Sequence, residues 1–168
     1  MPEPVDALCI GEALVALRSS GLLALGAPLT PAVAGAESNV AIALSRLGHQ
    51  AAWCGVVGAD QAGALVLRTL RAEGVDLRCV RREPRSATGL MVREQRLPGL
   101  VRVDYHRRGS AGSRLDLADV RRALRTVKPR VIHVTGISLA ISAQARACLL
   151  YTSPSPRDRT RSRMPSSA

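Results

Sequence analysis

The stretch Ala34-Gly-Ala-Glu-Ser-Asn-Val-Ala-Ile-Ala-Leu-Ser-Arg-Leu-Gly48 decides the fold, because it joins a glycine-containing turn to an amphipathic helix. Within it, Val40, Leu44 and Leu47 recur at the spacing of one helix face, which predicts that they face the core. Gly48 stands where a residue in the left-handed conformation commonly ends a helix. The stretch therefore predicts one complete helix with a turn before it.

The start of this helix is also a possible binding site. Gly35 lets a ligand approach the backbone closely, and the amides of a helix N-terminus favour oxygen-rich, anionic ligands. Polar side chains at positions 37–39 are expected to satisfy free backbone N–H groups of the first turn. An ordinary loop that enters a buried helix fits the same residues equally well, so this stretch alone leaves binding open.

The neighbouring segments alternate between strand and helix patterns. Residues 5–17 are mostly apolar, which predicts a buried strand and then a second short strand after a turn. Residues 51–58 predict another buried strand, Asp60 is placed to cap a helix over residues 61–73, and residues 75–80 predict a further strand. This alternation predicts an α/β fold with parallel strand pairing.

Glu12 interrupts the first apolar run, next to Gly11. It follows the first strand at its carboxyl end, and ligands bind outside that end of open α/β sheets. A solvated carboxylate in a surface turn is slightly favoured over a role in binding. We therefore predict a surface position for Glu12.

A β-hairpin is predicted over residues 88–95 and 100–106, on either side of the turn signal Pro98-Gly99. Its second strand alternates apolar and polar residues, as in a sheet with one solvated face. Tyr105 and Arg107 then point to the same face, where a phenol and a guanidinium suit hydroxyl and carboxylate recognition. On this segment alone, an exposed edge hairpin with an incidental arginine is the favoured interpretation.

The last third of the chain predicts fewer elements. Residues 109–113 form a turn of small residues that could cradle an oxyanion, although the lysine of a P-loop is missing. A helix is expected over residues 116–127, a buried strand over 131–135 and a helix from Ser142 toward Leu150. Residues 151–168 have the composition of a disordered tail.

Composition argues against several classes of protein. The net charge of +11 comes from scattered arginines, with Lys128 the only lysine, and few aromatic side chains could stack on bases, so we expect no nucleic-acid partner. No CxxC pair occurs among the four cysteines, which indicates reduced thiols and no metal site; they are Cys9, Cys54, Cys79 and Cys148. Neither a signal peptide nor a membrane-spanning run is evident, so we expect a cytoplasmic protein without membrane contact.

Taken in order, these motifs resemble the ribokinase-like (PfkB) carbohydrate kinases, most of all the 2-keto-3-deoxygluconate kinases. The resemblance covers nearly all of residues 5–147; its motifs are Gly11-Glu12 and residues 35–48, 55–63, 70–75, 88–90, 105–113 and 133–137. It implies the N-terminal part of a mainly parallel sheet flanked by helices. It also implies a small β lid, built from residues of about 12–33 and 87–108, that closes over a sugar.

The resemblance also implies which residues bind the substrate. Gly35 and Asn39 would contact sugar hydroxyls, and Tyr105 and Arg107 would hold the keto-acid end. Met91 falls where these kinases often place an aromatic contact. A mild departure is the alanine at position 34, where the family usually has a glycine.

These kinases carry the nucleotide site, the anion hole and the catalytic aspartate in their C-terminal half, and no such motif occurs here. We therefore expect residues 1–147 to be the N-terminal part of a kinase domain, without a catalytic or metal-binding residue of its own. ATP and Mg²⁺ would serve the full-length parent, and the fragment itself would be inactive. Residues 148–168 are expected to be a disordered, non-native tail, which looks like translated sequencing-adaptor sequence.

The partners implied are a sugar or sugar acid and, through the lid sheet, a second copy of the chain. One alternative is a stand-alone sugar-binding or regulatory module that lacks the nucleotide half. A second is a basic nucleic-acid-binding protein. The first interpretation, a fragment of a sugar kinase, is favoured over both.

Overall fold

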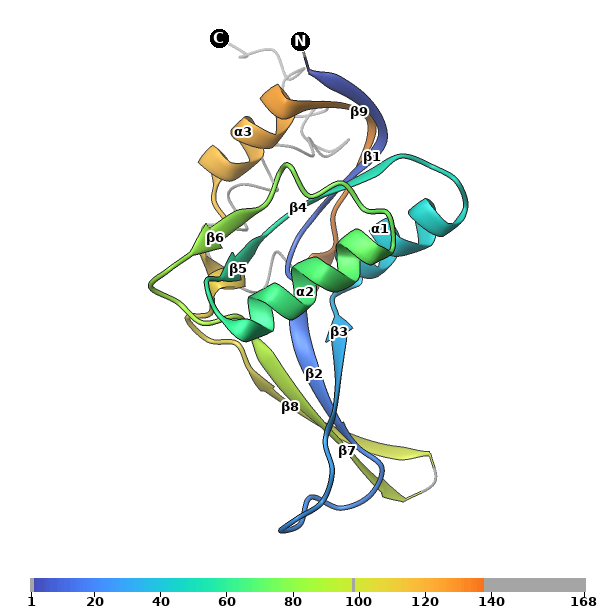
Figure 1. The fold of residues 1–168 in the computed structure, drawn as a ribbon, viewed down its shortest axis with the longest axis vertical. Coiled ribbons are helices and arrows are strands. Elements are labelled where there is room, and N and C mark those ends of the chain that lie inside the picture. The colour runs from blue at the N-terminus through green and yellow to red at the C-terminus, as the bar shows by residue number, and fades with distance from the viewer. Residues whose placement is uncertain (1, 98, 138–168) are drawn as a thin grey trace, which may run out of the picture.

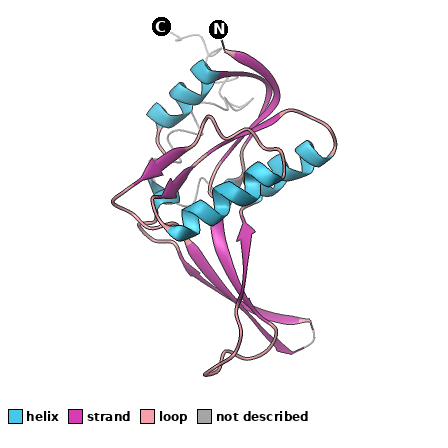
Figure 2. Cartoon of the chain, in the orientation of Figure 1, coloured by secondary structure: helices cyan, strands magenta, loops and turns pink. Residues whose placement is uncertain are grey.

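A computed structural model describes residues 2–97 and 99–137. The described chain forms an α/β body and a sheet that projects from it, with helices only on the body (Figures 1 and 2). The helix expected from Ser142, the cysteine at position 148 and the expected tail lie outside the described residues.

The body is built around a parallel three-stranded sheet in the order β4-β1-β9. Its strands are β1 (Glu3–Ile10), β4 (Ala51–Cys54) and β9 (Val127–His133). Cys9 of β1 faces Trp53 on one side and His133 on the other. The predicted α/β fold with parallel pairing is therefore confirmed.

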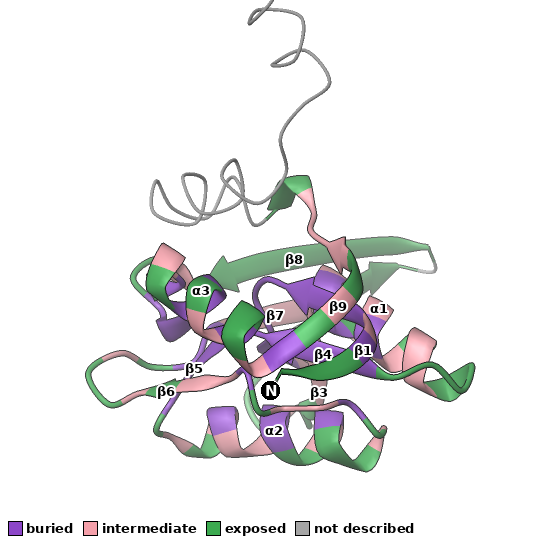
Figure 3. Cartoon of the chain, turned by 90° about the horizontal axis from the view of Figure 1, so that it is seen from above, coloured by how far each residue is buried: buried purple, intermediate pink, exposed green. Residues whose placement is uncertain are grey.

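Helices cover both faces of this sheet, and each face has its own core. Leu8 and Ile10 pack toward Val120 of α3 (Leu117–Thr126), while Cys9 packs toward Val66 and other apolar residues of α2 (Gln61–Ala72). Successive side chains of a strand point to opposite faces, which is why one apolar run serves both cores. Figure 3 shows α3 and α2 on opposite sides of the sheet.

The expected strand over residues 75–80 is wrong. Asp76 alone bridges to β4: its N–H donates to the Ala51 carbonyl and its carbonyl accepts from the Trp53 N–H. The strand forms further along the chain instead, where β6 (Arg81–Glu83) lies parallel to β5 (Val56–Gly58). The apolar residues of 75–80 pack in or against the core, whereas the backbone of β6 forms the strand pairing.

The projecting sheet has four strands in the order β3-β2-β7-β8. The predicted hairpin is its antiparallel pair β7 (Leu90–Leu97) and β8 (Leu100–His106), and the short second strand is β2 (Leu14–Ser19). β3 (Thr30–Ala34) was not predicted, because its segment looked irregular. All these strands lie within or next to the ranges expected for a lid; their action as a lid stays a prediction.

Among the described residues, two of the three α-helices begin as local signals indicate. The Asp60 carboxylate accepts the Gly63 N–H of α2 at 2.7 Å, and Asp116 forms a capping box with Asp119 in α3. In α1 (Ala36–Arg46), by contrast, no side chain caps the first turn, so that expectation is wrong. Gly48 does adopt the left-handed conformation after α1, with φ of 85°.

The buried face of α1 also differs from the prediction. Leu47 is 75% exposed, whereas the fully enclosed residues of the helix are Glu37, Ser38 and Ala41. The expected buried strand near residue 131 is likewise an edge strand in the described sheet, with Val131 60% exposed. Both predictions rested on the spacing of apolar residues. That spacing does not show which residues another element of the fold covers.

We expect Asp60→Ala to lower the free energy of unfolding by about 1–2 kcal/mol, because the side chain caps α2 and also accepts from the N–H and hydroxyl of Thr88. Burial raises the pKa of the Asp60 carboxyl, but these hydrogen bonds outweigh it and the net pKa is lowered from its usual 3.8. The stabilisation is thus complete above the unfolded pKa and lost as pH falls through the folded one.

Urea unfolding of wild type and Asp60→Ala at neutral and acidic pH measures this effect. The difference in the free energy of unfolding between the two proteins should become smaller at acidic pH. Asp104→Ala is the matched control, because that carboxylate is half exposed and pairs with Arg102 on the same strand. An equal loss from both substitutions, or a gap that widens in acid, would contradict the capping account.

Candidate functional site

A pocket of about 130 Å³ lies where the projecting sheet joins the body. All five site residues expected from the sequence line it, namely Gly35, Asn39, Met91, Tyr105 and Arg107. The remaining lining residues are Glu12, Leu14, Ala34, Ala36, Glu37 and Ile137. Residues that are far apart in the sequence therefore meet at one place, which makes this pocket the candidate site.

The fold brings these residues together from both parts of the molecule. Gly35 precedes α1 and Asn39 lies in its first turn, on the body. Met91 and Tyr105 are directly opposite one another on β7 and β8 of the projecting sheet. A ligand in the pocket would touch both parts at once.

Arg107 supplies the cationic group of the pocket. Its guanidinium carbon lies 4.5 Å from the centre of the Tyr105 ring, so the phenol and the guanidinium share one face as predicted. One guanidinium nitrogen lies 3.0 Å from a carboxylate oxygen of Glu12. A planar guanidinium held by an aromatic ring and a carboxylate is well suited to bind a second carboxylate.

Glu12 is not at the surface, so the sequence interpretation of this residue is wrong. It is only 4% exposed and accepts hydrogen bonds from Arg107 and from the Ser110 hydroxyl at 3.2 Å. Burial raises the pKa of the Glu12 carboxyl, the Arg107 charge opposes that rise, and nearby Glu37 adds to it. Its partners lie 95 and 98 residues away in the sequence, so no local pattern could reveal them.

Gly35 is required by close contact within the protein. A Cβ atom at this position would lie 2.4 Å from the Glu12 carbonyl oxygen and 2.5 Å from the Ser38 hydroxyl. A side chain there would push the start of α1 away from the segment after β1. The glycine thus keeps the two segments that frame the pocket in contact.

Glu37 is a second buried carboxylate at the pocket wall. It accepts a hydrogen bond from the Thr135 hydroxyl at 2.6 Å, beyond the end of β9. A Cβ atom at Gly11 would lie 2.2 Å from the Glu37 carboxyl carbon, so the glycine makes room for it. The segment Gly11-Glu12 after β1 therefore packs directly against the first turn of α1, which contains Glu37 and Ser38.

The turn of small residues after β8 does not provide a free anion cradle. The N–H of Ser110 donates to the Arg107 carbonyl, that of Ala111 to Ala87 and that of Ser113 to Ser110. These amides are engaged within the chain, and the Ser110 side chain is directed to Glu12. The turn contributes to the site through that hydroxyl.

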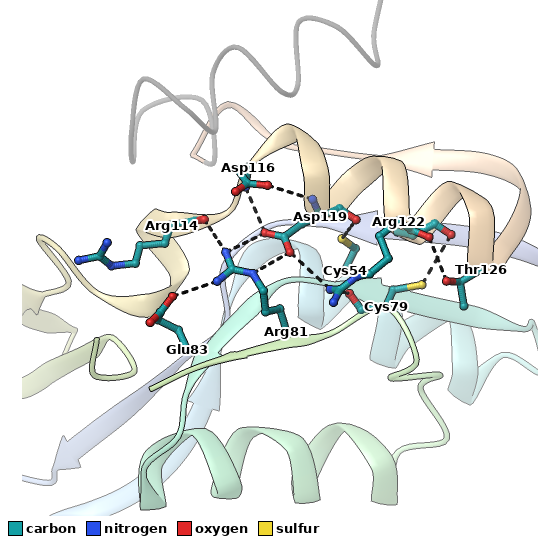
Figure 4. Close-up of polar contacts among 10 residues, drawn as sticks. Cys54, Cys79, Arg81, Glu83, Arg114, Asp116, Asp119, Arg122 and Thr126 are labelled. Atoms are coloured by element: carbon teal, nitrogen blue, oxygen red, sulfur yellow. Dashed lines mark hydrogen bonds and ion pairs between the residues drawn. The ribbon is translucent and has the colours of Figure 1, made fainter. Parts of the chain in front are cut away.

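An ion-pair network fixes the segment that follows, as Figure 4 shows. Arg81 of β6 makes two hydrogen bonds to the buried Asp119 carboxylate of α3, at 2.7 and 2.9 Å. It also donates to the Arg114 carbonyl at the end of the short 3-10 helix Ala111–Arg114. The network ties β6, this helix and α3 together and stands outside the pocket.

The cysteines of the described residues are structural. Cys9, Cys54 and Cys79 are buried within the cores. Burial raises the pKa of Cys9 and of Cys79 to about 11, so neither thiol ionises at neutral pH.

Within the described part of the chain, no group of three or more His, Cys, Asp or Glu side chains could hold a metal ion. No helix among these residues has the length and apolar character needed to cross a membrane.

The fold and the pocket define a class: α/β proteins with a small pocket between the body and a projecting β-sheet. The model of the pfkB family of carbohydrate kinases matches residues 6–136. The chain therefore belongs to the pfkB carbohydrate kinase family, as its motifs indicated.

Two curated relatives carry the same name. The chain is 37% identical over 145 residues to the 2-dehydro-3-deoxygluconokinase of Bacillus subtilis, covering 84% of this chain and 44% of that protein. It is 36% identical over 151 residues to the 2-dehydro-3-deoxygluconokinase of Thermoproteus tenax, covering 85% of this chain and 46% of that protein. The chain thus spans about half the length of the curated relatives it matches.

Solved structures give the same fold. A PfkB protein from Polaromonas sp. JS666 superposes with a TM-score of 0.81 at 34% identity, covering 88% of this chain and 50% of that one. A fructokinase from Xylella fastidiosa with bound ATP superposes with a TM-score of 0.76 at 23% identity, covering 90% of this chain and 47% of that one. The ribokinase-like fold is therefore shown.

Proposed function

We propose that residues 1–137 form the acceptor-binding part of an ATP-dependent sugar-acid kinase, with 2-keto-3-deoxygluconate (2-dehydro-3-deoxygluconate) as the substrate. The observation that carries the proposal is the placement of Arg107 beside Tyr105 in the pocket that Asn39 also lines. The names of the two curated relatives support the same substrate class.

The pocket offers one group for each part of such a substrate. The Arg107 guanidinium would pair with the carboxylate, and the Tyr105 hydroxyl can donate to the neighbouring keto oxygen. Asn39 and the backbone near Gly35 would hydrogen-bond to hydroxyls further along the sugar. Met91 would contact the deoxygenated carbon, where a thioether is a better neighbour than a polar group.

Phosphoryl transfer needs more than this pocket supplies. Holding ATP and Mg²⁺ in line with the acceptor hydroxyl is most of the catalysis in this reaction class, and a carboxylate base accepts the hydroxyl proton. The described residues offer neither a metal-binding cluster nor a nucleotide-binding motif, so they do not fit these groups. We infer that these parts belong to the remainder of a full-length kinase, and that residues 1–168 alone are inactive.

Release of ADP from ATP by the full-length kinase tests the proposal, with 2-keto-3-deoxygluconate, gluconate, fructose and ribose as acceptors. We expect turnover with the keto acid at the highest kcat/KM of the four. If the protein binds the sugar acid but never consumes ATP, the alternative of a stand-alone binding module holds instead. Turnover with fructose or ribose alone would contradict the substrate assignment.

The outer strand of the projecting sheet supports a second copy of the chain as a partner. Every residue of β8 is exposed, including Leu100, Val101 and Val103, and this strand is an edge of the described sheet (Figure 3). Exposed apolar edge strands invite pairing with another chain. We propose a homo-oligomer through this sheet, which light scattering of the full-length kinase would detect as a mass above one chain. A cytoplasmic location stays a prediction.

A further inference from the structure

Glu12 sits where the connections between the body and the projecting sheet converge. It lies between β1 and β2, and it accepts hydrogen bonds from Arg107 and Ser110, on the return connection after β8. Its carbonyl oxygen lies against Gly35, between β3 and α1. Glu12 therefore contacts two other connections between the body and the projecting sheet, one through its side chain and one through its carbonyl oxygen.

The surrounding glycines show that the site is shaped around this carboxylate. A Cβ atom at Gly112 would lie 2.7 Å from the Cγ atom of Glu12, and one at Gly89 would lie 3.1 Å from its carboxylate oxygen. Contacts this short exclude a side chain at Gly112 and leave almost no space at Gly89. The proposed substrate contacts do not account for either glycine, whereas the space that the Glu12 side chain occupies does.

The charges facing Glu12 are few. Arg107 on the return connection and Glu37 on α1 act on it electrostatically, and Tyr105 lies across the pocket. A buried carboxylate is costly unless it is paired and hydrogen-bonded. The Ser110 hydroxyl donates to one carboxylate oxygen of Glu12, and the Arg107 guanidinium donates to the other. This second hydrogen bond fixes the orientation of the guanidinium, including the edge that does not contact Glu12.

We propose that Glu12 is a positioning residue for acid recognition: its buried carboxylate, cradled by Gly89 and Gly112 and hydrogen-bonded to Ser110, holds Arg107 toward the substrate carboxylate. This inference rests on the proposed function and adds a residue that acts through Arg107, without touching the substrate. Its effect is expected mainly on acid substrates, because a neutral sugar has no negative charge to pair with the guanidinium.

Steady-state kinetics of the full-length kinase with 2-keto-3-deoxygluconate and with a neutral sugar tests this. Glu12→Gln should raise the KM for the keto acid about tenfold, with kcat within about twofold, and change the KM for the neutral sugar little. The same substitution in an Arg107→Ala background should add nothing, because its target is gone. Glu12→Asp should recover part of the loss by restoring the charge.

Glu83→Gln is the matched control, since Glu83 pairs with Arg81 at the same 3.0 Å but outside the pocket. It should leave both KM values unchanged. An equal effect of Glu12→Gln in both backgrounds, or on both substrates, would overturn the positioning role, and so would an unchanged KM for the keto acid. Failure of the proposed function is distinguishable, because the unmodified kinase would then show no preference for the keto acid.

Discussion

Arg107→Ala in the full-length kinase is expected to weaken binding of 2-keto-3-deoxygluconate by about 1.5–3 kcal/mol, the scale of a hydrogen bond to a charged group. This corresponds to roughly a tenfold to 150-fold higher Kd. The reason is geometric: the guanidinium lies in the pocket, stacked on Tyr105 and held by Glu12, and no other described residue that lines the pocket carries a positive charge. Isothermal titration calorimetry measures the change.

A neutral sugar provides the internal comparison for this variant. Its Kd should change by less than about threefold. A sugar hydroxyl loses only one neutral hydrogen bond when the guanidinium is removed, and a water molecule can supply that bond. Arg102→Ala is a second control, since Arg102 is an exposed arginine of β8 paired with Asp104. Equal losses for the acid and the neutral sugar would contradict the carboxylate role of Arg107.

Residues 1–168 on their own are expected to show no ATP turnover above the buffer blank. Correct alignment of two reactants supplies about 7–11 kcal/mol of a catalysed barrier, and the described residues can align only the acceptor. The chain spans 44% and 46% of its two curated relatives, which leaves most of a kinase outside it.

The comparison is a coupled assay of residues 1–168 and of the full-length kinase at equal concentration, with 2-keto-3-deoxygluconate present. Purified monomer of the short chain is also expected to be scarce, because β9 presents exposed residues such as Val131 at the edge of the described sheet. Turnover by residues 1–168 within about tenfold of the full-length kinase would contradict this account.

Local signals in the sequence predicted local structure well. Asp60 and Asp116 cap helices because a carboxylate needs only the amides of the next turn, and Gly48 ends α1 for an equally local reason. The elements that were missed depend on distant partners. β6 forms where β5 accepts it, and β3 forms because β2 lies alongside, and neither partner is visible in the segment itself.

The same division holds for the site. Gly35, Asn39, Met91, Tyr105 and Arg107 were named from the resemblance, and the structure places all five around one pocket, while their roles stay predictions. Glu12 was missed because its burial depends on partners nearly one hundred residues away. A glutamate beside a glycine looks like a surface turn until the connections that enclose it are known.

The central claim is that this pocket binds a sugar acid by its carboxylate. A crystal structure of the full-length kinase with 2-keto-3-deoxygluconate tests it most directly. We predict the substrate carboxylate at hydrogen-bond distance from the Arg107 guanidinium, about 2.7–2.9 Å, with hydroxyls against Asn39 and the backbone near Gly35. A substrate bound in the opposite direction, or outside the pocket between α1 and the projecting sheet, would contradict the claim.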